Sequence, residues 1–202
     1  MADEEGGVGL TARVLAVLTL ASTPALAADD VPLKLDSARA AYQKGDLARA
    51  ARDVEAALKA MQERLGRIFA ETLPTLSNRW KPDEVEIQGL GEIGGGLSIT
   101  RAYTRDDQSL NASLLLDSPA GESAQALLAA PVAQQHVRKV KVGGEEAVLR
   151  FDPSTSTGEI TMMVGNRVVL EVQGDNITSA DPLLEAAAAW NLAKIRTLLG
   201  GI

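Results

Sequence analysis

The sequence predicts an α+β fold: an antiparallel sheet of about six to seven strands with helices packed on it, preceded by an N-terminal helical hairpin. Three observations predict this fold. Apolar residues recur at spacings of three and four over residues 35–72, which is the period of a helix. Beyond residue 82 the apolar residues alternate with polar ones, which is the period of a strand. Short turns that contain glycine separate several of the alternating runs, so consecutive strands are expected to be antiparallel neighbours.

The first expected element is a pair of helices. Asp36 is expected to cap a short helix that runs through Tyr42 and Lys44, and Gly45 and Asp46 supply a stop and a new start. The second helix has charged residues on one side and an apolar stripe on the other, formed by Leu47, Ala51, Val54, Leu58, Met61, Leu65 and Ile68. A single hairpin cannot bury its own apolar face, so this pair must lean on another part of the protein.

The remaining elements alternate between strands and helices. Strands are expected around residues 85–87, 97–99, 110–116, 140–142, 147–151, 160–164 and 168–172. One helix is expected over residues 120–130, ending at Pro131. A last helix is expected over residues 183–199, introduced by Asp181 and Pro182 and ended by Gly200. The predicted order is helix, helix, three strands, helix, four strands, helix.

Residues 1–27 have the pattern of a secretory signal peptide. Arg13 precedes a short apolar run, and the small residues Ala25 and Ala27 resemble a cleavage site. The apolar run is too short to span a bilayer comfortably. We therefore expect a periplasmic protein, cleaved near Ala27, with a helical hairpin over residues 28–75 and a sheet domain over residues 76–202. A buried or membrane-anchoring N-terminal helix is the alternative.

The composition argues against several classes of protein. The 202 residues include 20 Lys and Arg and 27 Asp and Glu, a formal net charge of −7, which is unsuited to general nucleic-acid binding. There is no cysteine, so disulfides and cysteine nucleophiles are excluded. The only histidine is His136, so neither a zinc site nor another metal centre is expected.

A glycine-rich segment, QGLGEIGGGLSI at residues 88–99, contains the spacing G-x-G-x-x-G at Gly89, Gly91 and Gly94. A dinucleotide site needs a helix directly after these glycines, because the pyrophosphate rests on the N-terminus of that helix. Here the following residues, 97–103, alternate and contain β-branched side chains. We therefore expect a connector between two strands and no cofactor.

Part of the chain resembles a known group of proteins. The run KVGGEEAVLRFDPSTSTGEITMMVGNRVVLEVQGDN, with the helix that follows it, resembles the closing half of small secreted bacterial proteins similar to the Mog1 and PsbP-like fold. The hairpin, followed by Leu73, Pro74 and Trp80, also resembles uncharacterised proteobacterial exported proteins, and the turn over residues 38–50 resembles that of a tetratricopeptide-type hairpin. The resemblance implies an α/β sheet-and-helix layout, export, and a binding or assembly role.

The leading functional hypothesis is a non-enzymatic periplasmic binding or accessory protein. Its partner would be an envelope protein or a small apolar ligand. The candidate contact residues lie in the glycine-rich loop and on the expected open face of the sheet: Gly91, Gly94, Gly95, Leu115, Met163 and Val169. The last three are alternatively covered by the N-terminal helices.

Two other hypotheses belong to different classes. One is an envelope hydrolase with an unrecognised site around His136, Ser118 and Asp117, the residue types of a nucleophile, a base and an orienting acid. The other is a structural protein whose long helical stripe pairs between subunits.

Overall fold

The computed structural model describes residues 30–131 and 135–200 of the chain. The helices are α1 (Val31–Gln43), α2 (Leu47–Ala70), α3 (Ala120–Ala129), α4 (Asp181–Ala188) and α5 (Leu192–Gly200), with a short 3-10 helix η1 (Gly91–Ile93). The strands are β1 (Lys81–Pro82), β2 (Glu86–Gly89), β3 (Leu97–Arg105), β4 (Gln108–Leu116), β5 (Val137–Val142), β6 (Glu145–Asp152), β7 (Thr157–Val164) and β8 (Val168–Asp175). The α+β prediction is confirmed. The two-residue β1 was not predicted.

All strands belong to one antiparallel sheet of eight strands, in the order β1-β3-β4-β8-β7-β6-β5, and β2 also pairs with β3. Strands β1 and β2 therefore follow one another along the same edge, and β5 forms the opposite edge. The hairpin turns between β5 and β6 and between β7 and β8, which contain glycine, agree with the sequence prediction, and β3 and β4 form a further hairpin.

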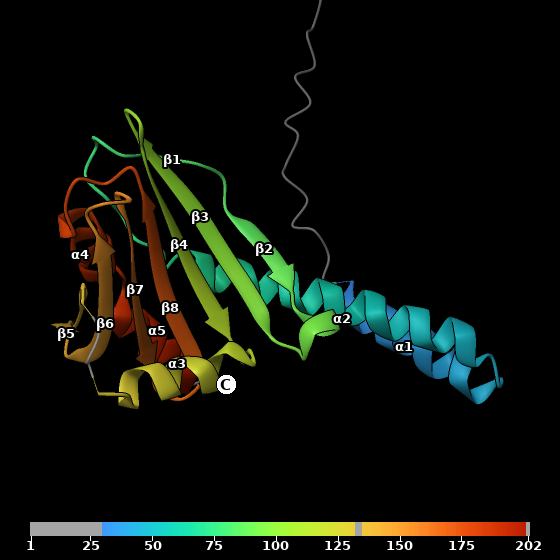
Figure 1. The fold of residues 1–202 in the computed structure, drawn as a ribbon. Helices are drawn as coiled ribbons and strands as arrows, with labels where there is room; N and C mark the ends of the chain where they lie inside the picture. The colour runs from blue at the N-terminus through green and yellow to red at the C-terminus, as the bar shows by residue number, and fades with distance from the viewer. Residues whose placement is uncertain (1–29, 132–134, 201–202) are drawn as a thin grey trace, which may run out of the picture.

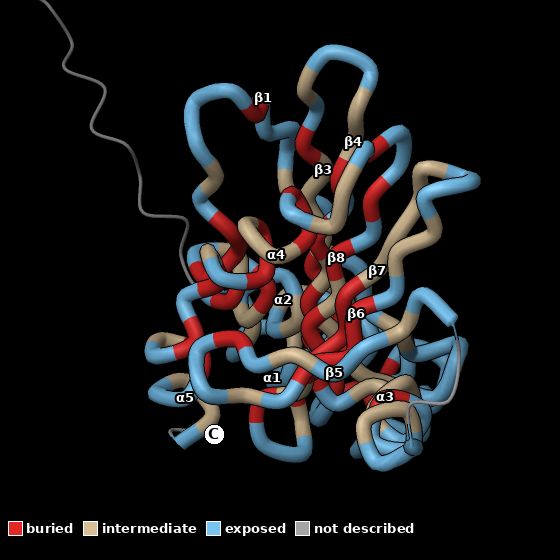
Figure 2. The backbone as a smooth tube through the Cα atoms, turned by 60° about the vertical axis from the view of Figure 1, so that its left-hand side comes forward, coloured by how far each residue is buried: buried red, intermediate tan, exposed pale blue. Residues whose placement is uncertain are grey.

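The two faces of the sheet are covered differently (Figure 1). One face forms the main core with α4, α5 and the C-terminal end of α2, and its fully buried side chains include Ile99, Leu114 and Leu170. Helix α3 packs on the other face, over β6, β7 and β8. Figure 2 shows the buried positions concentrated along the strands and α4, while the strand-connecting loops are mostly exposed.

The helical hairpin projects from one edge of the sheet (Figure 1). Only the C-terminal end of α2 reaches the core, where Phe69 is fully buried and Gly66 lies directly against Ile87 of β2. After the helix, the hydroxyl of Tyr103 donates to the carbonyl of Pro74 at 2.6 Å, which ties the following segment to β3. The tip of the hairpin therefore stands clear of the sheet.

Two helix predictions differ from the structure. The first helix begins at Val31 and not near Asp36, and Pro32 occupies its first turn, where proline is tolerated. The last helix is broken into α4 and α5. The side chain of Asn191 accepts a hydrogen bond from the Lys194 N–H at 3.0 Å, so it caps a new helix.

The predicted signal peptide, residues 1–27, lies outside the described residues. Among the helices of residues 30–131 and 135–200, none is long and apolar enough to cross a membrane.

Candidate functional site

The strongest candidate is an exposed line of apolar side chains on the hairpin, which we call the hairpin row. It consists of Leu35 and Tyr42 of α1 and Leu47, Val54, Leu58 and Met61 of α2, which are 44, 68, 63, 51, 48 and 42% exposed, respectively. Large apolar side chains scattered singly over a surface need no explanation, whereas a contiguous line of them marks an interaction surface. The sequence predicted the α2 part of this row but not its exposure.

The row is exposed because α1 packs on a different side of α2. The contact between the helices is made by buried alanines, Ala38 and Ala41 of α1 and Ala50 and Ala57 of α2. Small residues let the two backbones approach closely. The large side chains of α2 lie about a quarter turn away from this contact.

Helix geometry places both parts of the row on the same side of the hairpin. The hydroxyl of Ser37 donates to the Asp53 carboxylate at 2.7 Å, which fixes the level of α1 against α2. Leu35 and Tyr42 lie about a quarter turn from this contact. In both helices the apolar residues lie a quarter turn from the contact in the same sense of rotation. Because the helices are antiparallel, Leu35 and Tyr42 therefore lie on the same side of the hairpin as Val54 and Leu58.

The glycine-rich segment is a structured connector. As predicted, a strand follows it, and η1 lies within it. Gly91 begins η1, while Gly94 and Gly95 have φ angles of 105° and 100°. A side chain at Gly94 would meet Pro119, so the loop packs against the connection between β4 and α3.

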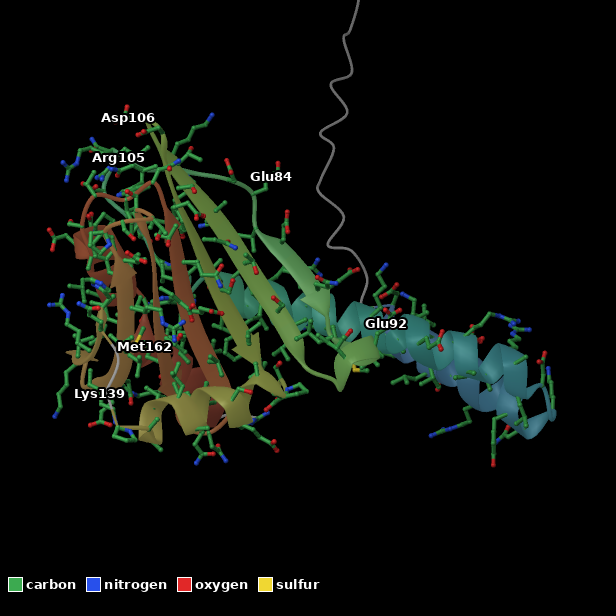
Figure 3. All side chains as sticks on the ribbon, viewed as in Figure 1. Glu84, Glu92, Arg105, Asp106, Lys139 and Met162 are labelled. Atoms are coloured by element: carbon green, nitrogen blue, oxygen red, sulfur yellow. The ribbon has the colours of Figure 1, made fainter. Side chains whose placement is uncertain are left out.

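This loop also adjoins the helical hairpin. Gly89, which precedes η1, lies against Gln62 of α2, and Figure 3 shows Glu92 on the loop between β2 and β3. An open hollow of about 360 Å³ is lined by Gln88, Gly89, Leu90, Gly91, Glu92 and Ile93. The loop thus borders the inner end of α2, beyond the projecting part of the hairpin.

The three apolar residues predicted on the open sheet face are brought together. Leu115 pairs with Val169, which pairs with Met163, so they form one row across β4, β8 and β7. Val169 is buried, and Leu115 and Met163 are half-buried. Helix α3 packs over β7 and β8 on this face, whereas α2 packs mainly on β2 and β3 and places Phe69 in the core on the opposite face. The alternative prediction, that the N-terminal helices cover these three residues, was therefore wrong.

The three candidate hydrolase residues lie at opposite ends of the sheet. Asp117 and Ser118 follow β4, and the Asp117 carboxylate forms a paired hydrogen bond with the Arg167 guanidinium at 2.6 and 2.7 Å. His136 precedes β5, and its carbonyl accepts from the Phe151 N–H. The two ends are six residues apart along β7, about 20 Å. The structure therefore does not bring these residues together.

His136 instead borders an open pocket of about 390 Å³ at the β5 edge. Its lining includes the buried Leu149, the half-buried Phe151 and the exposed Arg138. Across from them, the Ser179 hydroxyl donates to the Asp181 carboxylate at 3.0 Å, at the start of α4. Because that serine hydroxyl is bonded to the carboxylate and not to the imidazole, the arrangement is not that of an activated nucleophile.

A carboxyl pair that the sequence analysis missed lies on the face that carries α3. Glu159 of β7 and Glu171 of β8 lie on neighbouring strands and share a hydrogen bond. Burial raises the pKa of Glu171, and the hydrogen bond and negative charge of Glu159 raise it further. Thr161 donates to Glu159 at 2.9 Å and Gln173 donates to Glu171 at 3.1 Å. The pair can be recognised only when the register of β7 and β8 is known, and the spacing of residues along the sequence does not give that register.

Glu171→Gln is expected to stabilise the protein at neutral pH. A raised carboxyl pKa means that the folded state disfavours the charge, so the wild type loses stability as pH rises from below the ordinary glutamate pKa through the raised value. Glutamine carries no charge and can still donate to Glu159. We expect a rise in Tm of roughly 2–4 °C at pH 7, allowing for solvent screening, and no rise at about pH 4.

Thermal unfolding of both proteins at the two pH values measures this difference. Glu146→Gln is the matched control, because Glu146 is exposed on β6 of the same sheet. A gain for Glu171→Gln that is equally large in acid, or that Glu146→Gln reproduces, would contradict the assignment.

The described residues contain no group of three or more His, Asp or Glu side chains able to hold a metal ion. Comparison with protein-family models, with curated proteins and with solved structures finds no match to this chain. The resemblance to the Mog1 and PsbP-like fold therefore stays a prediction, and the functional argument rests on this chain's own surfaces.

Proposed function

We propose that this protein is a non-enzymatic binding or accessory protein of the bacterial periplasm, and that the hairpin row is its binding surface. The observation that carries the proposal is the exposure of Leu47, Val54 and Leu58 along one side of a helix that projects from the sheet. Covering one half-exposed leucine or valine gains about 1 kcal/mol. Six such side chains in one row offer a partner a substantial driving force.

The rest of the hairpin supports a role in binding. Residues 31–70 contain eight Lys and Arg and five Asp and Glu, a net charge of +3 in a chain whose total is −7. A cationic element on an acidic body gives the hairpin its own electrostatic character. The sheet holds one end of α2 rigidly through Phe69, so the row is presented at a fixed orientation.

Location in the periplasm is supported by the sequence of residues 1–27. Export predicts that the mature chain begins at Ala28, two residues before the first described residue, Asp30. The N-terminal sequence of the protein recovered from a periplasmic extract tests this step. A chain that begins upstream of Arg13 would overturn it.

Site-specific photo-crosslinking tests the binding surface. A photoreactive amino acid at Val54, inside the hairpin row, is expected to give a discrete crosslinked product in the native envelope. Leu33 is the matched control, because it is a 70% exposed leucine of α1 outside the row. The Val54 product should disappear when Leu58 is replaced by glutamate. No crosslink at Val54, or the same products from Val54 and Leu33, would refute the proposed surface.

A further inference from the structure

We propose that the hairpin row pairs with the same row of a second copy of this chain, in an antiparallel, twofold-symmetric bundle of four helices. This inference rests on the proposed function, because it names the partner of that surface. Its starting point is the spacing of the α2 stripe, which is four and three in strict alternation from Leu47 to Ile68. Such a heptad seam is typical of a helix that packs against another helix.

The seam is narrow, which favours a helical partner over a membrane surface. Glu55 lies beside it on the flank away from α1, and Arg52 and Lys59 follow on the side of α2 opposite the seam. A helix that lies in a membrane interface presents a wider apolar face to the acyl chains. Helix α1 packs on the alanines of the other flank, so within the described chain no helix fills the projecting part of the seam.

One antiparallel register aligns the apolar side chains of two copies. A twofold axis that crosses α2 between Arg52 and Asp53 places Leu47 opposite Leu58 of the second copy. The same axis places Ala51 opposite Val54, so that a small residue meets a larger one. Layers of this kind, in which the two positions of the heptad face each other, are those of an antiparallel coiled coil.

The same axis aligns the two α1 helices. The hydrogen bond from Ser37 to Asp53 sets α1 level with the centre of the seam, so the axis crosses α1 near Ser37. Leu35 of one copy then lies within about two residues, roughly 3 Å, of Tyr42 of the other. Leu35 and Tyr42 are therefore covered in the register that covers Leu47, Val54 and Leu58 of α2.

The charges at the α1 rim of the hairpin are complementary in this register. Arg39 lies level with Asp36 of the second copy on the α1 rim. These two side chains make no hydrogen bond or ion pair within residues 30–131 and 135–200. Twofold symmetry makes this pairing occur twice and closes the assembly as a dimer.

Size-exclusion chromatography with light scattering across a dilution series of the purified protein tests the pairing. The wild type is expected to have twice the chain mass, dissociating on dilution. Leu58→Glu should weaken the dimer at least about 30-fold, because the carboxylate would be buried against Leu47 of the second copy in an apolar layer. Leu33→Glu adds the same charge outside the row and should leave the dimer intact. Circular dichroism verifies that each variant is folded, which is expected because both positions are exposed.

A charge exchange tests the register. Arg39→Glu and Asp36→Arg should each weaken the dimer several-fold at low salt, and the double variant should restore it, because each reversed charge then meets the other. A wild type that is monomeric at all concentrations, or a dimer that Leu58→Glu leaves unchanged, would overturn the pairing. If the monomeric protein still crosslinks through Val54 to a different envelope protein, the proposed function stands and only self-pairing fails.

Discussion

Replacing Phe69 with alanine is expected to lower the free energy of unfolding by about 3–5 kcal/mol. Phe69 is fully buried, and it is the largest side chain that α2 contributes to the core. Its ring is the main apolar contact between the hairpin and the sheet, so its removal leaves a cavity where the two meet. Chemical denaturation, with the slope held equal between variants, measures the loss.

Ile68 provides the matched control for this experiment. It is the neighbouring residue on the same helix turn but is 39% exposed, so Ile68→Ala should cost about 1 kcal/mol or less. Equal losses for the two variants would mean that α2 is not docked through Phe69. A large loss confined to Phe69 would show that the hairpin and the sheet unfold as one unit, and that the projecting row is held from its base.

The fold was predictable because the helical spacing of three and four and the strand alternation of every second residue are both clear in the sequence. Leu110, Ala112, Leu114 and Leu116 alternate in the sequence, and all four are buried on one face of β4. The break between α4 and α5 was not predicted, because the apolar spacing continues across it. Asparagine is a residue type that often caps helices, so a cap at Asn191 was conceivable from the sequence. Only the hydrogen bond that its side chain accepts from the Lys194 N–H shows that a new helix begins there.

The exposure of the hairpin row could not be predicted from hydropathy. Periodicity identifies the most apolar side of a helix, and the usual inference is that this side is buried. In α2 the closest helix contact is made by Ala50 and Ala57, a quarter turn away, because small residues permit the shorter interaxial distance. The most apolar side of α2 therefore stays exposed. This exposure depends on how α1 packs against α2, which the sequence pattern of α2 alone does not give.

The sheet residues of the candidate site illustrate the same limit. Alternation correctly placed Leu115, Met163 and Val169 on one face, since every second residue of a strand shares a side. Their cover by α3 follows from the path of the chain after β4, which returns across that face before β5. The pairing of Glu159 with Glu171 depends on the register of β7 and β8. Neither the cover by α3 nor the pairing of the two glutamates can be predicted from the spacing of residues along the sequence.

The glycine-rich connector yields the second large effect. Gly96→Ala is expected to cost about 3 kcal/mol or more. Gly96 has a φ of +98°, and an added Cβ would lie 2.6 Å from the carbonyl oxygens of both Leu116 and Asp117. Backbone atoms cannot move aside as a flexible side chain would, so β3 must shift against β4. The loss in Tm by differential scanning calorimetry measures the cost.

Substitutions at two neighbouring glycines distinguish the two causes of this cost, which are backbone strain and the clash of the added Cβ. Gly95 has a φ of +100° with open space around its Cβ position, so Gly95→Ala should show only the backbone strain, about 1–2 kcal/mol. Gly91 lies outside the left-handed region and also faces open space, so Gly91→Ala should be close to neutral. The expected order of destabilisation is Gly96, then Gly95, then Gly91. Equal effects at all three would mean that the segment has no fixed conformation, whereas the expected order would establish that the close approach of β3 to the β4–α3 connection requires glycine at position 96.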